Sequence, residues 1–84
     1  MKISFKNSVL KQLKYYRKKD PLAYKIIWDK LEDIMENPYD IRYIKVNKHP
    51  NYKRAKKGGY RICFKIVDDI IYVGRIDGRE KVYN

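Results

Sequence analysis

The start of the chain changes from an alternating to a helical pattern of apolar positions. Polar and apolar side chains alternate over residues 2–5, which predicts a short β-strand. Asn7 and Ser8 can each cap a helix, because a short polar side chain there accepts a hydrogen bond from a free backbone N–H group. The apolar residues that follow recur at helical spacing: Val9, Leu10, Leu13 and Tyr16. A helix is therefore expected directly after the strand.

A second helix is predicted to begin at Asp20 and Pro21, a capping residue followed by proline at the first helical position. It runs to about Glu36, where Asn37 and Pro38 stop it, because proline disfavours a helical conformation in the residue before it. Its apolar stripe consists of Ala23, Ile27, Leu31, Ile34 and Met35. Such a stripe needs a second layer to pack against.

After the second helix the period becomes that of β-strands. Strands are expected at residues 44–46, 52–56, 60–67 and 70–75, with a possible edge strand at 79–83. Turns are expected at residues 49–51, 57–59, 68–69 and 77–78. The glycines at 58 and 59 suit a hairpin turn, since glycine takes positive φ at little cost.

These elements predict an α+β fold in a single domain that spans residues 1–84. It has an N-terminal strand, two helices and then a three- to four-stranded antiparallel meander. Helices on one face of the sheet would leave the other face open. In the strand 60–67, Arg61 and Lys65 alternate with Ile62, Phe64 and Ile66. If the apolar set lies under the helices, the basic set lines an exposed concavity.

Charge is distributed unevenly along the chain. Lys and Arg number 21 against 10 Asp and Glu, a formal net charge of +11. Residues 41–67 contain nine of these cations and no carboxylate. A one-signed stretch in a small protein favours a polyanionic partner such as a nucleic acid. A solvated basic face, an acidic protein partner and a membrane lipid surface are the alternatives.

Several classes are excluded or disfavoured by composition. No signal peptide is visible, and no apolar stretch approaches the roughly 18 residues that a membrane helix needs. Cys63 is the sole cysteine, so the chain can form no internal disulfide and no cysteine zinc site. These features indicate a protein of the reducing cytoplasm that has no membrane partner.

The second half of the chain carries a resemblance to a known family. Residues 52–55 (YKRA) and 59–62 (GYRI) resemble the paired strands of the RelE/ParE toxin superfamily. Residues 68–73 (DDIIYV) resemble the hairpin that follows, and residues 78–83 (GREKVY) resemble the closing motif. These pieces occur in order and after two helices, which is typical of a RelE-type toxin.

The resemblance implies a toxin of a type II toxin–antitoxin system that acts as a ribosome-dependent endoribonuclease. Such a toxin enters the ribosome, contacts ribosomal RNA and cleaves messenger RNA. The 2′-hydroxyl of one nucleotide attacks the adjacent phosphate and leaves a 2′,3′-cyclic end. The chemistry uses neither a metal nor a cofactor, and an antitoxin protein wraps the toxin and blocks it.

The cleavage needs a base, an acid and positive charge at the phosphorane. Tyr83 is the predicted base, because nearby cations such as Arg61, Arg79 and Lys53 would favour its phenolate. Arg61 is predicted to stabilise the phosphate. Arg79 is a candidate for charge stabilisation or for assisting the leaving group.

Other basic residues are predicted to bind RNA: Lys53, Arg54, Lys56, Lys57 and Lys65. Because side chains alternate along a strand, Lys53, Arg54 and Lys56 cannot all face the substrate. Lys53 is favoured as the residue that faces it, with Arg54 as the alternative. Asp77 stands where some family members carry a second basic residue, and Arg75 is a possible substitute.

Two potential nucleophiles or bases are assigned structural roles. His49 lies beside a proline in an expected loop, away from the inferred site. Cys63 is expected to be a small strand residue, because no histidine accompanies it in a motif.

Two other functions remain open on the same fold. One is a ParE-like toxin that inhibits DNA gyrase and cuts no RNA. The other is a non-catalytic RNA-binding module, which would show a salt-dependent affinity for RNA without cleavage.

Overall fold

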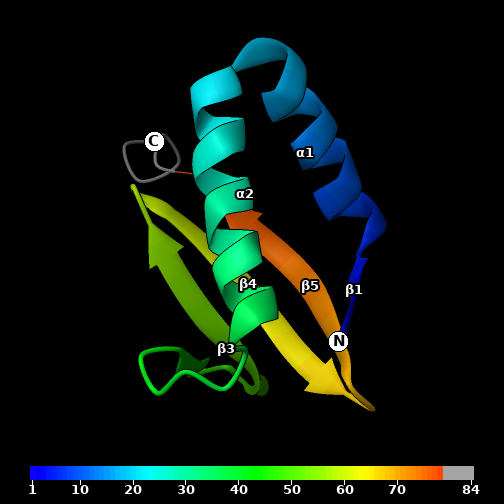
Figure 1. Cartoon of the computed structure of the whole chain (residues 1–84), viewed down its shortest axis with the longest axis vertical. Helices are drawn as coiled ribbons and strands as arrows, with labels where there is room; N and C mark the ends of the chain where they lie inside the picture. Colours follow the sequence, from blue (N-terminus) through cyan, green and yellow to red (C-terminus); the bar gives the residue numbers. More distant parts are fainter. Residues whose placement is uncertain (79–84) are drawn as a thin grey trace.

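The structure is a computed structural model that describes residues 1–78, and the predicted strand at residues 79–83 lies outside this range. Its elements in chain order are β1 (Lys2–Phe5), α1 (Asn7–Lys19), α2 (Pro21–Glu36), β2 (Ile44–Val46), β3 (His49–Lys57), β4 (Tyr60–Val67) and β5 (Ile70–Asp77) (Figure 1). The predicted order of a strand, two helices and a meander is confirmed.

The strands form a single sheet in the order β1-β5-β4-β3-β2. The pairs β2–β3, β3–β4 and β4–β5 are antiparallel, as expected for a meander. Strand β1 instead pairs in parallel with β5, with Ile3 opposite Ile71. The long connection that a parallel pairing requires is made by residues 6–69, which include both helices and strands β2 to β4. The first and last described strands therefore lie side by side, which the local pattern did not predict.

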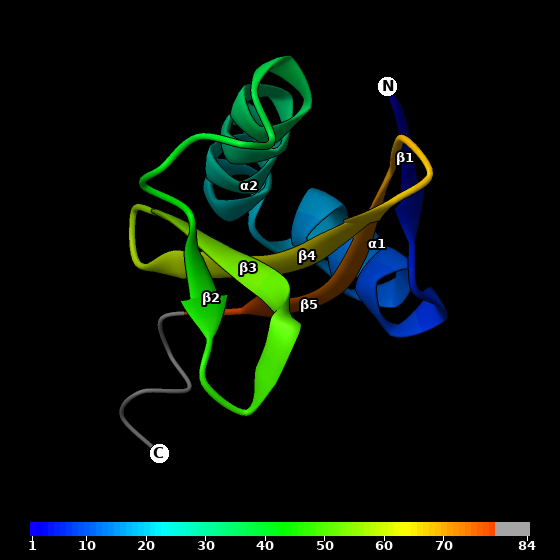
Figure 2. The same cartoon turned by 90° about the horizontal axis from the view of Figure 1, so that it is seen from below.

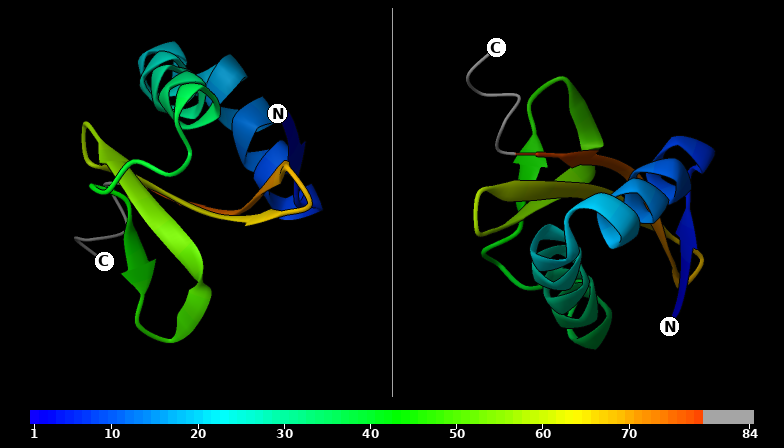
Figure 3. Two further views of the ribbon diagram at one scale, coloured as in Figure 1. Left: turned by 60° about the horizontal axis from the view of Figure 1, so that its bottom comes forward. Right: turned by 90° about the horizontal axis from the view of Figure 1, so that it is seen from above.

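Both helices cover the same face of the sheet, as Figures 2 and 3 show. Helix α1 packs on β5, and α2 packs on β3 and β4. The apolar stripes of both helices meet the inward side chains of the strands, and the largest side chains with almost no exposure are Phe64, Ile27, Leu31, Ile34, Ile62, Ile71 and Ile76. The prediction of helices on one face and an open face behind them is confirmed. Neither helix is long and apolar enough to cross a membrane.

The two helix starts differ in how they are capped. The Asp20 carboxylate accepts a hydrogen bond from the Ala23 backbone N–H at 3.2 Å, which confirms the predicted cap of α2. The predicted cap of α1 at Asn7 or Ser8 is wrong, because the N-cap is Lys6 and no side chain caps this end. The Lys6 N–H donates to the Val73 carbonyl at 3.1 Å, so the sheet holds Lys6 in extended conformation and the helix starts directly after it.

Two of the expected turns are replaced by strand. Residues 49–51 belong to β3, because Val46 pairs with His49 and the reversal is made by residues 47–48. Asp77 belongs to β5, where it pairs with Arg61. The turns at residues 57–59 and 68–69 are confirmed, with positive φ at both glycines and at both aspartates of the second turn.

Candidate nucleic-acid interface

The sheet face opposite the helices, here called the open face, carries the predicted basic side chains of β4. Ile62 and Phe64 are buried under the helices, whereas Arg61 is exposed on the other side. Lys65 lies on the open face with its Nζ 5.4 Å from the centre of the Tyr52 ring. The prediction that Arg61 and Lys65 point away from the apolar set is confirmed.

Register places further cations beside Arg61. Lys56 of β3 pairs with Arg61, and Asp77 of β5 pairs with it from the other side. Two residues further along β4, Cys63 pairs with Arg54 of β3 on one side and with Arg75 of β5 on the other. Directly opposite residues in an antiparallel pair point to the same face. Two adjacent rows of the open face therefore hold four cations and one carboxylate.

A cavity of about 430 Å³ opens on this face. The residues that line it are Lys6, Val46, His49, Tyr52, Arg54, Arg61, Cys63, Gly74, Arg75 and Asp77. Gly74 contributes by being small: a Cβ there would lie 2.9 Å from Cε1 of Tyr52. The missing side chain leaves room for the Tyr52 ring beside the cavity.

The alternation of β3 divides the predicted RNA-binding residues between the two faces. Ala55 is buried in the core, so Lys53 and Lys57 share the helix-covered side with it. Arg54 and Lys56 share the open face with Arg61. Arg54, the alternative, therefore lines the cavity, whereas the favoured Lys53 lies on the other side of the sheet. Ala55 was the signal, since a lone apolar residue in a basic strand marks the side that faces the core.

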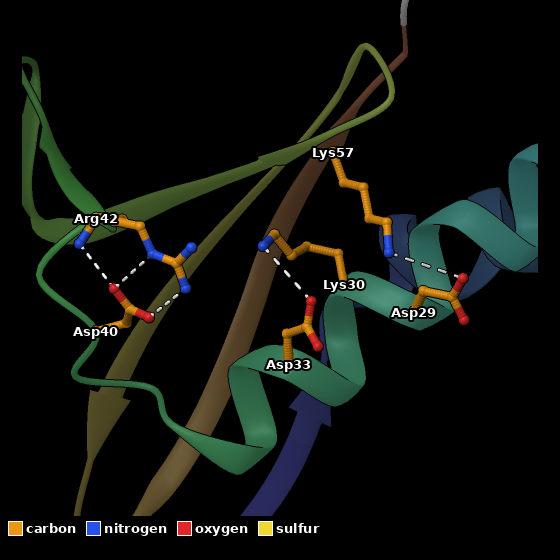
Figure 4. Close-up of polar contacts among 6 residues, drawn as sticks. All are labelled: Asp29, Lys30, Asp33, Asp40, Arg42 and Lys57. Carbon is orange, nitrogen blue, oxygen red and sulfur yellow. Dashed lines mark hydrogen bonds and ion pairs between the residues drawn. The ribbon is translucent and has the colours of Figure 1, made fainter.

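The cations on the helix side have partners. Lys57 lies 3.8 Å from Asp29 of α2, and the Lys53 Nζ lies 5.3 Å from the centre of the Tyr39 ring (Figure 4 shows the ion pair). Exposed ion pairs of this kind contribute little to stability. They do compensate positive charge on this side of the sheet.

Two further ion pairs near the helix side are drawn in Figure 4. Lys30 lies 3.6 Å from Asp33, and Arg42 donates to Asp40 at 2.7 Å. The hydrogen bonds from Arg42 lower the pKa of the Asp40 carboxyl to about 2, so it stays charged at neutral pH.

On the open face, the cations of β3 and Arg61 lack such partners. Within the described residues, no carboxylate forms an ion pair with Arg54, Lys56 or Arg61. Asp29 of α2 thus pairs with Lys57 on one side of β3, while the cations on the other side of this strand keep their full positive charge. An uncompensated positive surface around a cavity is the electrostatic footprint of a polyanion site.

Asp77 is the one carboxylate of the cavity lining, and it is held by Arg75. The Arg75 Nε donates to Asp77 at 2.8 Å, and this hydrogen bond raises the pKa of the guanidinium. Both side chains lie on the open face of β5. Arg75, the possible substitute for the basic residue that some family members carry at the position of Asp77, thus lines the cavity. Its guanidinium also offsets the negative charge of the Asp77 carboxylate.

Cys63 is poorly placed to act as a nucleophile. Burial raises the pKa of its thiol, and the nearby Asp77 carboxylate raises it further. A thiol with a raised pKa carries little thiolate at neutral pH, and the thiolate is the reactive form. The geometry agrees with the structural role expected for this residue.

His49 is the residue that sequence reasoning placed wrongly. It lines the cavity together with Arg54 and Arg61, and its ring centroid lies 6.5 Å from that of Tyr52. The adjacent Pro50 suggested a loop, but both residues belong to β3. The signal was the short segment 47–48, which forms the two-residue turn between β2 and β3. The structure thus brings an imidazole to the predicted phosphate site.

Tyr83 and Arg79, the predicted base and second catalytic cation, lie outside the described residues. Among residues 1–78, no three His, Cys, Asp or Glu side chains gather closely enough to hold a metal ion.

Solved structures share this architecture. YoeB in the YoeB–YefM complex from Staphylococcus aureus matches with a TM-score of 0.73 and 18% identity, covering 92% of this chain and 94% of that chain. A free, doubly mutated RelE toxin from E. coli matches with a TM-score of 0.70 and 23% identity, covering 98% and 88%. The RelB–RelE complex from Methanococcus jannaschii matches with a TM-score of 0.60 and 23% identity, covering 94% and 93%. These matches show a RelE-like fold.

Sequence comparison gives the family. No curated protein matches the chain significantly. The family model described as the ParE toxin of type II toxin–antitoxin systems matches residues 3–83, almost the full length. This match and the fold confirm the resemblance read from the sequence: the chain belongs to the ParE toxin family of type II toxin–antitoxin systems, within the RelE/ParE superfamily.

Proposed function

We propose that this toxin is a ribosome-dependent endoribonuclease that cleaves messenger RNA in the cytoplasm. The observation that carries the proposal is the open-face cavity, in which Arg61 is exposed and neither Arg61 nor Arg54 has a carboxylate partner among residues 1–78. The resemblance to RelE-type toxins supports the same chemistry. The ribosome would supply the messenger in its decoding site, and the basic surface would contact ribosomal RNA.

Each step of the cleavage has a candidate residue. A base removes the proton of the 2′-hydroxyl, the 2′-oxygen bonds to the adjacent phosphorus, and the bond to the 5′-oxygen breaks as that oxygen gains a proton. Negative charge accumulates on the phosphorane, where a fixed cation stabilises the transition state more than the ground state. Arg61 has the position for this role, and Arg79 is proposed to assist it. This chemistry needs neither a metal nor a cofactor.

Proton transfer is assigned to two side chains. Tyr83 remains the proposed base, because cations around a phenol favour its phenolate. His49 is proposed as the second proton-transfer group, because it lines the cavity and imidazole is the side chain best suited to exchange protons near neutral pH. Arg54 and Lys65 are proposed to hold neighbouring phosphates, and the Tyr52 ring to stack on a base.

The Tyr83→Phe variant tests the base, and His49→Gln tests the second group. Each is expected to lower single-turnover cleavage of messenger on programmed ribosomes by about 10²- to 10⁴-fold, the usual contribution of general acid–base catalysis. Primer extension would map the breaks, and ribosome binding should be almost unchanged in both variants. Full activity of Tyr83→Phe would eliminate that residue as the base.

A second function has one observation in its favour: the matching family model describes ParE toxins. A ParE-like toxin would inhibit DNA gyrase without cutting RNA. Supercoiling by purified gyrase and translation of a reporter separate the two. Loss of supercoiling with intact messenger would replace the nuclease proposal, and RNA binding without cleavage would indicate a non-catalytic module.

The cognate antitoxin is the proposed protein partner, as the complexes of YoeB with YefM and of RelB with RelE suggest. A largely apolar groove of about 410 Å³ runs between α1, α2 and β1, and we refer to it as the helix groove. Its lining residues are Phe5, Leu10, Lys11, Leu13, Lys14, Arg17, Tyr24 and Trp28. An apolar floor with cations along its rim fits an acidic amphipathic helix. We assign this groove to a helix of the antitoxin.

Leu10→Asp is expected to weaken antitoxin binding roughly 30-fold, because it places a charge among apolar contacts and repels an acidic helix. Leu10 is 48% exposed, so the variant should still fold. Leu22→Asp is the matched control, since Leu22 is 69% exposed on α2 and does not line the groove. Calorimetric titration with the antitoxin measures both. Equal affinities for the two variants would place the antitoxin elsewhere.

A further inference from the structure

A second basic hollow lies around the edge of β3, on the side toward α2. It has a volume of about 310 Å³ and is here called the edge groove. Its lining residues are Lys30, Arg42, Tyr43, Ile44, Arg54 and Lys56. Four of these six residues are cations, and they come from α2, from the segment before β2 and from β3. Arg54 and Lys56 were both predicted to bind RNA, whereas Lys30 and Arg42 were assigned to no site from the sequence.

The edge groove joins the open-face cavity through one side chain. Arg54 lines both hollows. Its partner on β4 is Cys63, and its partner on β2 is Ile44, so it lies in the strand between the two sites. Lys56, next to Arg54 on the same face of β3, pairs with Arg61. Positive side chains therefore run without interruption from Arg61 over β3 and into the edge groove.

Arg54 carries a buried hydrogen-bond donor that no group in the described part of the chain satisfies. Its Nε atom is out of contact with solvent and has no hydrogen-bond partner in the described part of the chain. A guanidinium that is partly removed from water normally acquires acceptors, because unpaired buried donors are destabilising. No carboxylate among residues 1–78 forms an ion pair with it. An anion seated beside Arg54 would compensate this charge.

Two of the other three cations, Lys30 and Arg42, are held by neighbouring side chains. Lys30 is held at 5.4 Å from the centre of the Tyr43 ring and 3.6 Å from Asp33, and only 14% of its side chain is exposed. Arg42 is held by two side-chain hydrogen bonds to Asp40, at 2.7 and 3.0 Å. Figure 4 shows Lys30 extending from α2 toward the sheet, with Arg42 on the segment that faces it. The two carboxylates offset part of the charge, yet Arg54 and Lys56 leave the groove positive.

We propose that the edge groove binds a second phosphate of the RNA strand whose cleaved phosphate lies at Arg61. This inference rests on the proposed function and adds the path of the substrate. The strand would leave the open-face cavity, cross β3 at Arg54 and place a flanking phosphodiester between Lys30, Arg42 and Lys56. Lys30 and Arg42 suit this role, because side chains that are already held lose little conformational entropy when the phosphate arrives.

Binding of uncleavable oligonucleotides tests the path without relying on catalysis. The probes are a dinucleotide and a hexanucleotide of RNA sequence with 2′-methoxy groups, which lack the attacking hydroxyl. The double variant Lys30→Gln with Arg42→Gln is expected to bind the hexanucleotide about 10-fold more weakly and the dinucleotide unchanged. The slope of log K against log salt should become shallower by about 0.7 for each phosphate contact that is lost.

Lys25→Gln is the matched control. Lys25 is also on α2 and pairs with Asp29 at 3.8 Å, but it lines neither hollow. An equal loss of affinity in Lys25→Gln would mean that only overall charge matters and would overturn the groove. Unchanged binding of the hexanucleotide by the double variant would overturn it as well. If the oligonucleotide data show no role for the edge groove, the proposal of cleavage at Arg61 still stands. If the edge groove contributes to binding but the protein cleaves no messenger on programmed ribosomes, the nuclease proposal fails and the RNA path is retained.

Discussion

Replacing Arg61 by glutamine is expected to lower messenger cleavage by about 10²- to 10³-fold, which corresponds to the loss of one preorganised donor at a developing negative charge. Arg61 is exposed on β4 in the middle of the sheet, and Lys56 and Asp77 flank it on the neighbouring strands. Its backbone is held by strand pairing on both sides, so the guanidinium is presented by a rigid element. Rigid presentation is what makes a cation effective at a transition state.

The measurement is single-turnover cleavage on programmed ribosomes, with the affinity for ribosomes measured separately. Most of the loss should appear in the rate constant and a smaller part in binding, since a phosphate is already charged in the ground state. Lys19→Gln at the end of α1 is the control, because it removes one charge away from the open face. If Arg61→Gln and Lys19→Gln cleave at the same rate, the open-face cavity is not the reaction site.

Replacing Phe64 by alanine is expected to reduce the free energy of unfolding by about 3–5 kcal/mol. Phe64 has no exposed surface and lies on the helix-covered side of β4, edge-on to Tyr43 with ring centroids 5.7 Å apart. The substitution removes the largest fully buried side chain and leaves a cavity beneath α2. The total free energy of unfolding of most natural proteins is only about 5–15 kcal/mol, so the variant should be close to unfolding.

Thermal unfolding followed by circular dichroism would measure this loss, and the midpoint should fall by about 12 °C or more. Val67→Ala is the control on the same strand, because Val67 is 44% exposed and its truncation should change stability by about 0.5 kcal/mol or less. A drop of only a few degrees in Phe64→Ala would contradict the core described here. Cleavage by the folded fraction should be preserved, since Phe64 faces away from Arg61.

Function and stability are thus assigned to opposite sides of one strand. The apolar residues of β4 bind the sheet to the helices, and the polar ones form the open face. On the helix-covered side of β3, Asp29 of α2 pairs with Lys57, whereas Arg54 and Lys56 on the open face have no carboxylate partner among the described residues.

Most of the elements could be predicted from the sequence, because the signals that create them are local. The cap at Asp20 and the hairpin turn at residues 57–59 follow from residue types at adjacent positions. The orientation of Arg61 opposite Ile62 follows from strand alternation. Arg61 was therefore found from the pattern and the resemblance together.

Other parts of the site depend on pairing between distant segments. The local pattern of residues 2–5 predicts a strand but does not indicate that it pairs in parallel with β5. His49 entered the cavity because β3 begins two residues after β2 ends, whereas Pro50 suggested a loop. Lys53 lies on the same side of β3 as buried Ala55, and Arg54 lies on the open face. Register decides each of these outcomes.

The sequence alone determined the types and order of the elements, the excess of positive charge and the family resemblance, because each depends on residues close together in the chain. Only the tertiary structure decided which cations stay unpaired, that His49 joins Arg61, and that Lys30 and Arg42 approach Arg54. The physical reason is that charge compensation acts through space. A basic residue becomes part of a site or of an ion pair according to what the fold brings next to it.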